Sequence, residues 1–210
     1  MPTFYDFHRA PSPRRARIVL AETGIAHDVQ SVDLAAREQL SDAFRAINPA
    51  CTIPALALED GTVLTDNAGI AAWAEAVQPE PPLLGTSPLE KAAVASWNSK
   101  IESECFTAIA EAMRNTAPAM KDRAITGPEN YAQIPELAAR GEARLRHFLE
   151  RFETHLAAST YVAGDRLSLA DITACVALDF AKVLRIDAYA DRPATKAWRD
   201  RLAQRPAFNL

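Results

Sequence analysis

The stretch NPACTIPALALEDGTVLTDNAGIA, residues 48–71, decides the fold of the first half of this chain. Two short apolar runs, 55–58 and 62–64, flank a Glu-Asp-Gly turn, and this pattern predicts a β-hairpin. Pro54 cannot donate a hydrogen bond to a sheet ladder, so it belongs at the start of a strand or at an edge. Because X-Pro bonds can be cis in tight turns, a cis Ile53–Pro54 bond is plausible here.

Helices and strands alternate on both sides of this hairpin. Asp66 and Asn67 follow its second run and can cap a helix from Ala68 to about Val77. The residues before the hairpin predict a strand over 2–7, a helix over 14–23, a strand over 27–34 and a helix over 37–47. Residues 1–78 therefore form an α/β domain with the order β-α-β-α-β-β-α.

The second half of the sequence predicts an all-α domain over residues 89–210. Four prolines in the stretch 79–88 indicate a stiff, non-helical linker before it. An apolar stripe at helical spacing predicts one long helix from Leu89 to about Ala117. Further helices are expected over about 134–158, from residue 168 onward, and over about 194–204.

Ser168 and Asp171 are spaced as a capping box at the start of one of these helices. We assign this motif a structural role only. The helix that follows is expected to bury five apolar side chains, namely Leu169, Ile172, Val176, Phe180 and Val183.

Composition argues against several classes of function. Hydrophobic residues make up 49% of the chain and charged residues 24%, as in ordinary soluble globular proteins. No apolar run approaches the roughly 20 residues of a membrane span, and the N-terminus lacks a signal-peptide pattern, so we expect a cytoplasmic protein without a membrane partner. Three widely spaced cysteines suggest neither a disulfide framework nor a metal site. A net charge of −4 gives no indication of nucleic-acid binding.

Five segments, in order along nearly the whole chain, resemble those of the cytosolic glutathione transferases. They are RRARIVLAETGI (14–25), NPACTIPAL (48–56), VLTDNAGIAAWAEA (63–76), YVAGDRLSLADI (161–172) and WRDRLAQRPAF (198–208). The resemblance implies a thioredoxin-like domain, a linker and a helical domain. It also implies a homodimeric detoxification enzyme that conjugates glutathione to small electrophiles or uses it to reduce peroxides. Glutathione would be the co-substrate, and no metal would be needed.

Two other functions stay open at this stage. One is a glutathione-dependent isomerase or dehalogenase on the same scaffold. The other is a non-catalytic binding or stress protein that kept the fold, because the serine that related bacterial sequences often carry before the arginine pair is replaced by Ala10.

The resemblance also implies how glutathione would be held. Together with the turn context, it leads us to expect a cis Ile53–Pro54 bond. The backbone N–H and C=O of Ile53, turned by this proline, would pair with the cysteinyl part as an added strand does, with Thr52 beside them. Asp66 and Asn67 stand where the family commonly has Glu-Ser and would hold the zwitterionic γ-glutamyl end. A plain helix cap is the alternative role for Asp66.

The chemistry of this family requires a thiolate. A free thiol with a pKa near ~8.5 is mostly protonated at neutral pH, and a hydrogen-bond donor beside a helix N-terminus lowers that pKa. Ser12 is the hydroxyl nearest to the expected position, and its alternative role is an N-cap with Pro13 as the first helical residue. Tyr5 is the second candidate, but its spacing along the strand is one residue off the expected pattern, which favours packing.

Arg14, Arg15 and Arg17 follow immediately and could form an anion site. Arg14 and Arg17 are three residues apart and share a helix face. We expect a solvated face with one arginine tied to an acid. Arg14 is the candidate for a contact with the glycyl carboxylate of glutathione.

Overall fold

The computed structural model describes residues 1–210, which form two compact units. The N-terminal unit comprises residues 1–81 together with 126–129 and residue 210. The helical unit comprises residues 82–125 and 130–209.

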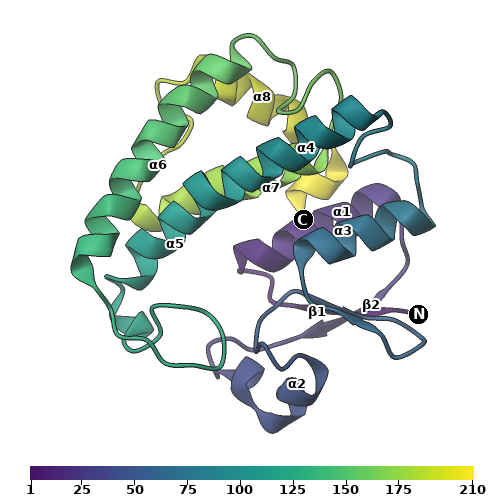
Figure 1. The fold of residues 1–210 in the computed structure, drawn as a ribbon, viewed down its shortest axis with the longest axis vertical. Helices are drawn as coiled ribbons and strands as arrows, with labels where there is room; N and C mark the ends of the chain where they lie inside the picture. The colour runs from purple at the N-terminus through teal and green to yellow at the C-terminus, as the bar shows by residue number, and fades with distance from the viewer. The chain divides into compact units, whose positions relative to one another are not determined.

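A four-stranded mixed sheet forms the centre of the N-terminal unit (Figure 1). The strands are β1 (Thr3–Asp6), β2 (Asp28–Ser31), β3 (Ala55–Ala57) and β4 (Val63–Leu64), in the spatial order β2-β1-β3-β4. β1 runs parallel to β2 and antiparallel to β3, and β4 completes the hairpin with β3. The predicted hairpin is confirmed.

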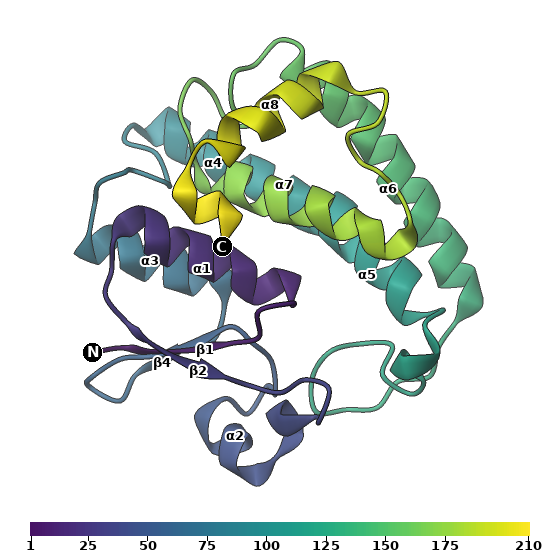
Figure 2. The same cartoon turned by 180° about the vertical axis from the view of Figure 1, so that it is seen from behind.

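Three helices cover this sheet. α1 (Pro11–Thr23) and α3 (Asn67–Val77) pack against each other on one face, and α2 (Asp42–Ile47) lies on the other (Figures 1 and 2). The element order is β-α-β-α-β-β-α, as the sequence predicts.

Side-chain alternation along the strands divides the core of this unit into two clusters. On the α1 and α3 face the cluster consists of Phe4, Ala16, Leu20, Leu56 and Ile70. On the α2 face it consists of Tyr5, Val32, Phe44, Ile53 and Ala55. Successive strand residues point to opposite faces, so Phe4 and its neighbour Tyr5 belong to different clusters.

The prediction of a single helix over 37–47 is wrong. A short 3₁₀ turn, Glu38–Leu40, comes first, and Ser41 then accepts a hydrogen bond from the Phe44 N–H as the N-cap of α2. A serine hydroxyl competes with the backbone for such bonds, so this side chain starts a new helix instead of continuing the old one.

Five α-helices form the helical unit: α4 (Pro88–Ile101), α5 (Thr107–Arg114), α6 (Pro135–Leu156), α7 (Leu169–Phe180) and α8 (Pro193–Ala203). α4 packs on α7, while α6 packs on both α5 and α8 (Figure 2). The predicted all-α architecture is confirmed.

The single helix predicted from Leu89 to Ala117 is wrong, because a π-helical turn, Glu102–Phe106, separates α4 from α5. The Thr107 hydroxyl donates to the Glu102 carbonyl within this turn at 2.8 Å. A π-helical turn lets the apolar stripe continue across it, so periodicity alone does not reveal the break.

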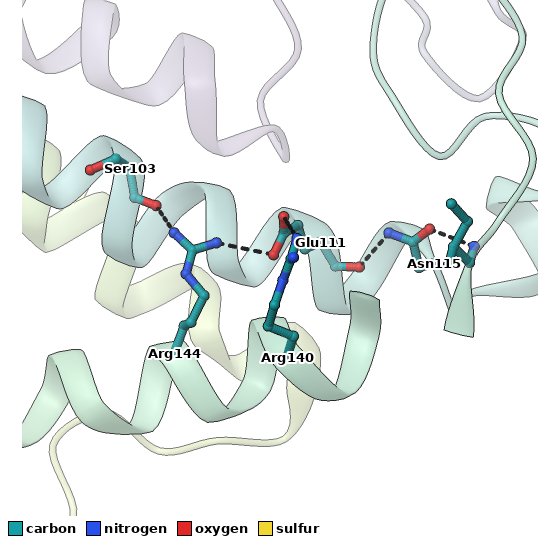
Figure 3. Close-up of polar contacts among 6 residues, drawn as sticks. Ser103, Glu111, Asn115, Arg140 and Arg144 are labelled. Carbon is teal, nitrogen blue, oxygen red and sulfur yellow. Dashed lines mark hydrogen bonds and ion pairs between the residues drawn. The ribbon is translucent and has the colours of Figure 1, made fainter. Parts of the chain in front are cut away.

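The two helices that follow this turn lie close together. Glu111 of α5 accepts from Arg140 and Arg144 of α6, both at 3.0 Å, and Arg144 also donates to the carbonyl of Ser103 in the π-helical turn (Figure 3). A Cβ atom on Gly141 would lie only 2.5 Å from the Ala108 carbonyl oxygen, so the approach of α6 to α5 requires glycine.

The predicted capping box at the start of α7 is confirmed. The buried Asp171 carboxylate accepts from the Ser168 N–H (2.9 Å) and hydroxyl (2.8 Å), the Val162 N–H (2.9 Å) and Trp198 Nε1 (2.9 Å). Burial raises the pKa of Asp171 above its ordinary value, and the four hydrogen bonds oppose that shift. The expected burial of Val183 is wrong, because α7 ends at Phe180 and Val183 is 46% exposed.

Candidate functional site

The N-terminus of α1 carries the main catalytic candidate. The helix begins at Pro11 with Ala10 as N-cap, so the alternative role of Ser12 as N-cap is wrong. Pro11 and Pro13 have no backbone N–H, which leaves Ser12 as the single N–H donor among the first three helical residues. The first turn contains no acidic residue. Ser12 therefore supplies both a backbone donor and a hydroxyl at the positive end of the helix.

Two neighbours use the Ser12 hydroxyl oxygen as an acceptor. Asn67 donates to it from Nδ2 at 3.0 Å, and Arg15 approaches from Nη2 at 3.5 Å. Amide and guanidinium nitrogens only donate, whereas a hydroxyl has one proton and two acceptor positions. These contacts leave the Ser12 proton free to be donated.

The N-terminus of α3 contributes the next two candidates. Asp66 occupies the N-cap position, but its exposed carboxylate accepts no hydrogen bond from the helix. The predicted alternative, that Asp66 serves only as a cap, is therefore wrong for its side chain. Asn67 is the first helical residue and is 7% exposed, and its Oδ1 atom is buried without a hydrogen-bond partner.

The predicted cis bond between Ile53 and Pro54 is confirmed. Neither the N–H nor the C=O of Ile53 takes part in a turn or loop hydrogen bond of the backbone. Asn48, which is buried, holds the preceding loop by donating from Nδ2 to the Thr52 carbonyl (2.7 Å) and hydroxyl oxygen (3.2 Å). Sequence reasoning missed this role of Asn48, although its place before a proline in the turn was a signal.

The surroundings of Tyr5 and of the arginines of α1 indicate packing and ion pairing. The Tyr5 ring packs edge-on against Phe44 at 5.9 Å between centroids, on the sheet face opposite α1. Arg17 forms a two-pronged ion pair with Asp6 at 2.8–3.1 Å, which confirms the expected arginine tied to an acid. The expected solvated face is wrong, because Arg15 is buried and Arg14 and Arg17 are only partly exposed. Arg14 is half-buried at the fourth position of α1.

The chain shows neither a metal-binding cluster nor a membrane-spanning helix. No three His, Cys, Asp or Glu side chains gather where they could hold a metal ion. No helix combines the length and the apolar character that crossing a bilayer demands.

The N-terminal unit therefore offers several groups suited to a small charged peptide. The hydrogen bond between Ser12 and Asn67 ties together the starts of α1 and α3, and helix N-termini favour anions. The carboxylate of Asp66 suits a cation. The backbone groups of Ile53 suit an extended peptide.

Comparison with known proteins gives matches over nearly the whole chain. The family model described as "Glutathione S-transferase, N-terminal domain" matches residues 10–77, and "Glutathione S-transferase, C-terminal domain" matches residues 109–206. Glutathione S-transferase 2 of Saccharomyces cerevisiae is 33% identical over 206 residues, which are 97% of this chain and 86% of that protein. Glutathione S-transferase F9 of Arabidopsis thaliana is 30% identical, covering 94% of this chain and 90% of the relative.

A solved structure agrees with these matches. The crystal structure of a glutathione S-transferase domain-containing protein from Marinobacter aquaeolei VT8 is 32% identical and superposes with a TM-score of 0.89. The match covers 98% of this chain and 99% of that one.

Proposed function

Since this chain belongs to the glutathione S-transferase family, we propose that it binds glutathione in its N-terminal unit and that Ser12 activates the thiol for attack on small electrophiles. The predicted family and fold are confirmed. Relatives 30–33% identical over nearly the whole chain support the predicted glutathione transferase. The observation that carries the proposal for Ser12 is its hydroxyl, which accepts from Asn67 and keeps its own proton.

The proposed mechanism lowers the pKa of the bound thiol. The Ser12 O–H donates to the thiolate, and the positive end of α1 stabilises the same negative charge. A hydrogen bond to a charged group contributes ~1.5–3 kcal/mol, which corresponds to roughly one to two pKa units. The thiol proton passes to solvent, and the thiolate then forms an S–C bond while the leaving group departs with its electron pair. The same thiolate can attack a peroxide oxygen, forming an S–O bond as the O–O bond breaks, and the departing alkoxide or hydroxide takes a proton from solvent. A second glutathione thiol then displaces water from the resulting sulfenic acid and gives the disulfide.

The rest of the tripeptide is assigned by charge. Asp66 would pair with the γ-glutamyl ammonium, while Asn67 and the start of α3 would hold the γ-glutamyl carboxylate. The N–H and C=O of Ile53, beside Pro54, would pair with the cysteinyl backbone. Two further contacts complete the proposal, Thr52 next to the cysteinyl part and Arg14 at the glycyl carboxylate.

The pH–rate profile of Ser12→Ala tests the proposed activation. Turnover at neutral pH should fall and the profile should move to higher pH by roughly one to two units, while glutathione affinity changes little. An unchanged profile would exclude the hydroxyl and leave the backbone N–H of residue 12, which the variant keeps. Tyr5→Phe is the matched control, since Tyr5 packs on Phe44 and its loss of a hydroxyl should leave the profile in place.

Assembly and location belong to the same proposal. We expect a homodimer that works in the cytoplasm, as is usual for the family. Light scattering should report twice the chain mass of 22.9 kDa, and a species of 22.9 kDa alone at micromolar concentration would contradict the dimer.

The alternative functions are separated by binding and turnover. A thermal shift with glutathione, followed by a panel of electrophiles and peroxides, should show both stabilisation and product. Glutathione binding without turnover of any of these would favour the non-catalytic protein. Turnover confined to isomerisation or dehalogenation substrates would favour the second enzyme class.

A further inference from the structure

We infer that Asn67 is a positioning residue that aims the Ser12 proton at the glutathione sulfur. Its amide N–H uses one acceptor position of the Ser12 oxygen, Arg15 approaches the same oxygen, and the hydroxyl proton stays available for the ligand. The inference rests on the proposed role of Ser12 and adds to the direct contact with glutathione that the family position of Asn67 suggests.

The hydrogen bond between Asn67 and Ser12 has a fixed direction. The Asn67 Nδ2 atom lies 3.0 Å from Ser12 Oγ, and an amide NH₂ group can only donate. A serine hydroxyl without such a partner can turn and donate to a nearby backbone carbonyl. The N–H from Asn67 instead fills one lone pair of Oγ, and the Arg15 contact at 3.5 Å lies on the same oxygen.

The same contact is also rigid. Asn67 is the first residue of α3, which packs directly on α1, the helix that carries Ser12. The Asn67 side chain is 7% exposed, and a hydrogen bond shielded from water is stronger than an exposed one. A contact between residues 55 apart in sequence thus fixes the hydroxyl relative to two helices.

The carbonyl oxygen of the Asn67 amide has no partner within the protein. Oδ1 of Asn67 is buried without a partner, so no second hydrogen bond within the protein competes for the orientation of the amide. The contact with Ser12 alone sets the direction of Nδ2.

Asn67→Asp reverses the polarity of this contact with almost no change of shape. A carboxylate only accepts hydrogen bonds, so the Ser12 hydroxyl would donate to the new carboxylate instead of to the glutathione sulfur. The pKa of the bound glutathione thiol should rise by about one unit or more, with a matching loss of turnover at neutral pH. Asn67→Ala, which removes the donor without adding an acceptor, should give a smaller rise.

A double-mutant cycle with Ser12→Ala separates positioning from other effects. The readout is the pKa of the bound thiol, followed by ultraviolet absorbance of the thiolate. In the Ser12→Ala background, Asn67→Ala should cause no further shift, and Asn67→Asp should keep only the through-space effect of its charge. Additive shifts would overturn the inference.

Direct binding and misfolding give different results. If Asn67 only held the ligand, Asn67→Ala would weaken glutathione binding and leave the thiol pKa unchanged, which would also overturn the inference. If Ser12→Ala itself has the wild-type thiol pKa, the proposed function of Ser12 fails. A shift in Ser12→Ala without one in either Asn67 variant defeats the positioning role alone. Thermal unfolding verifies each fold, and the alanine cycle still decides the question if Asn67→Asp does not fold.

Discussion

The starts of α7 and α1 both carry a serine, and the two are built in opposite ways. At α7 the Asp171 carboxylate accepts four hydrogen bonds, two of them from Ser168. At α1 the N-cap is Ala10, which has no capping side chain, and no acid stands in the first turn. The Ser168 hydroxyl donates its proton to Asp171 within the protein, whereas Ser12 still has a proton to give.

A second pair of helices repeats the contrast. α4 begins with a complete capping box, in which Ser87 accepts from the Glu90 N–H and Glu90 accepts from the Ser87 N–H. α3 has Asp66 as its N-cap residue, and the Asp66 carboxylate forms no capping bond. α1 and α3, the two helix starts at the candidate site, thus lack a side-chain cap, as expected where helix N-termini are kept for an anionic ligand. The caps do not follow the two units, because Ser41 caps α2 of the N-terminal unit and α6 of the helical unit begins without a side-chain cap.

The largest expected effect comes from breaking the start of α7. Asp171→Ala leaves buried donors of Ser168, Val162 and Trp198 without a partner. Each such group costs about 1–3 kcal/mol, so the free energy of unfolding should fall by roughly 3–5 kcal/mol in urea titration. Glu90→Ala is the matched control at the exposed box of α4 and should cost much less. Equal losses in the two variants would remove the contrast between buried and exposed caps.

Two helix glycines differ in the room that their surroundings leave for a Cβ atom. A Cβ on Gly141 of α6 would lie 2.5 Å from the Ala108 oxygen and 2.9 Å from the Ala112 nitrogen, whereas a Cβ on Gly69 of α3 meets nothing within 4 Å. Gly141→Ala should therefore destabilise by about 1–3 kcal/mol. Gly69→Ala should stabilise by up to about 1 kcal/mol, because alanine favours helix. Urea unfolding of both variants in the absence of glutathione gives the two signs, and a stabilising Gly141→Ala would contradict the close helix approach.

The smallest expected effect is on how the stability of the protein falls at low pH. Hydrogen bonds from the Thr86 hydroxyl, the Thr86 N–H and the Ser87 N–H lower the pKa of Glu90 from 4.5 to about 2. A carboxyl with a lowered folded-state pKa contributes stability above its unfolded pKa and loses it as pH falls through the folded value. Glu90→Gln should therefore flatten the fall in stability between pH 4.5 and about 2. Melting temperatures across that range that decline in parallel with wild type would refute this role.

Local patterns predicted the features that depend on neighbours in sequence. The hairpin and the capping box of Ser168 follow from residues within a few positions of each other. The cis Ile53–Pro54 bond was expected from its turn together with the family resemblance. Helix boundaries were harder where two residues compete for one position. Both Pro11 and Pro13 suit a first helical turn, so the sequence could not decide whether Ser12 lies before the helix or inside it.

Local sequence patterns could not predict contacts between residues that are distant in sequence. The bond from Asn67 to Ser12 spans 55 residues, and the bond from Trp198 to Asp171 spans 27. Neither leaves a periodic trace in the sequence. The resemblance to a family indicated which residues belong to the candidate site, but only the geometry indicates which atom of Asn67 meets Ser12.

The most direct test removes the hydroxyl of each serine in turn and compares the two variants. Ser12→Ala and Ser168→Ala each remove one hydroxyl from the start of a helix, and the pKa of the bound glutathione thiol is titrated by ultraviolet absorbance in both. We predict that Ser12→Ala raises this pKa by roughly one to two units, while Ser168→Ala leaves it at the wild-type value and lowers only stability. A thiol pKa in Ser12→Ala equal to that of wild type would contradict the account.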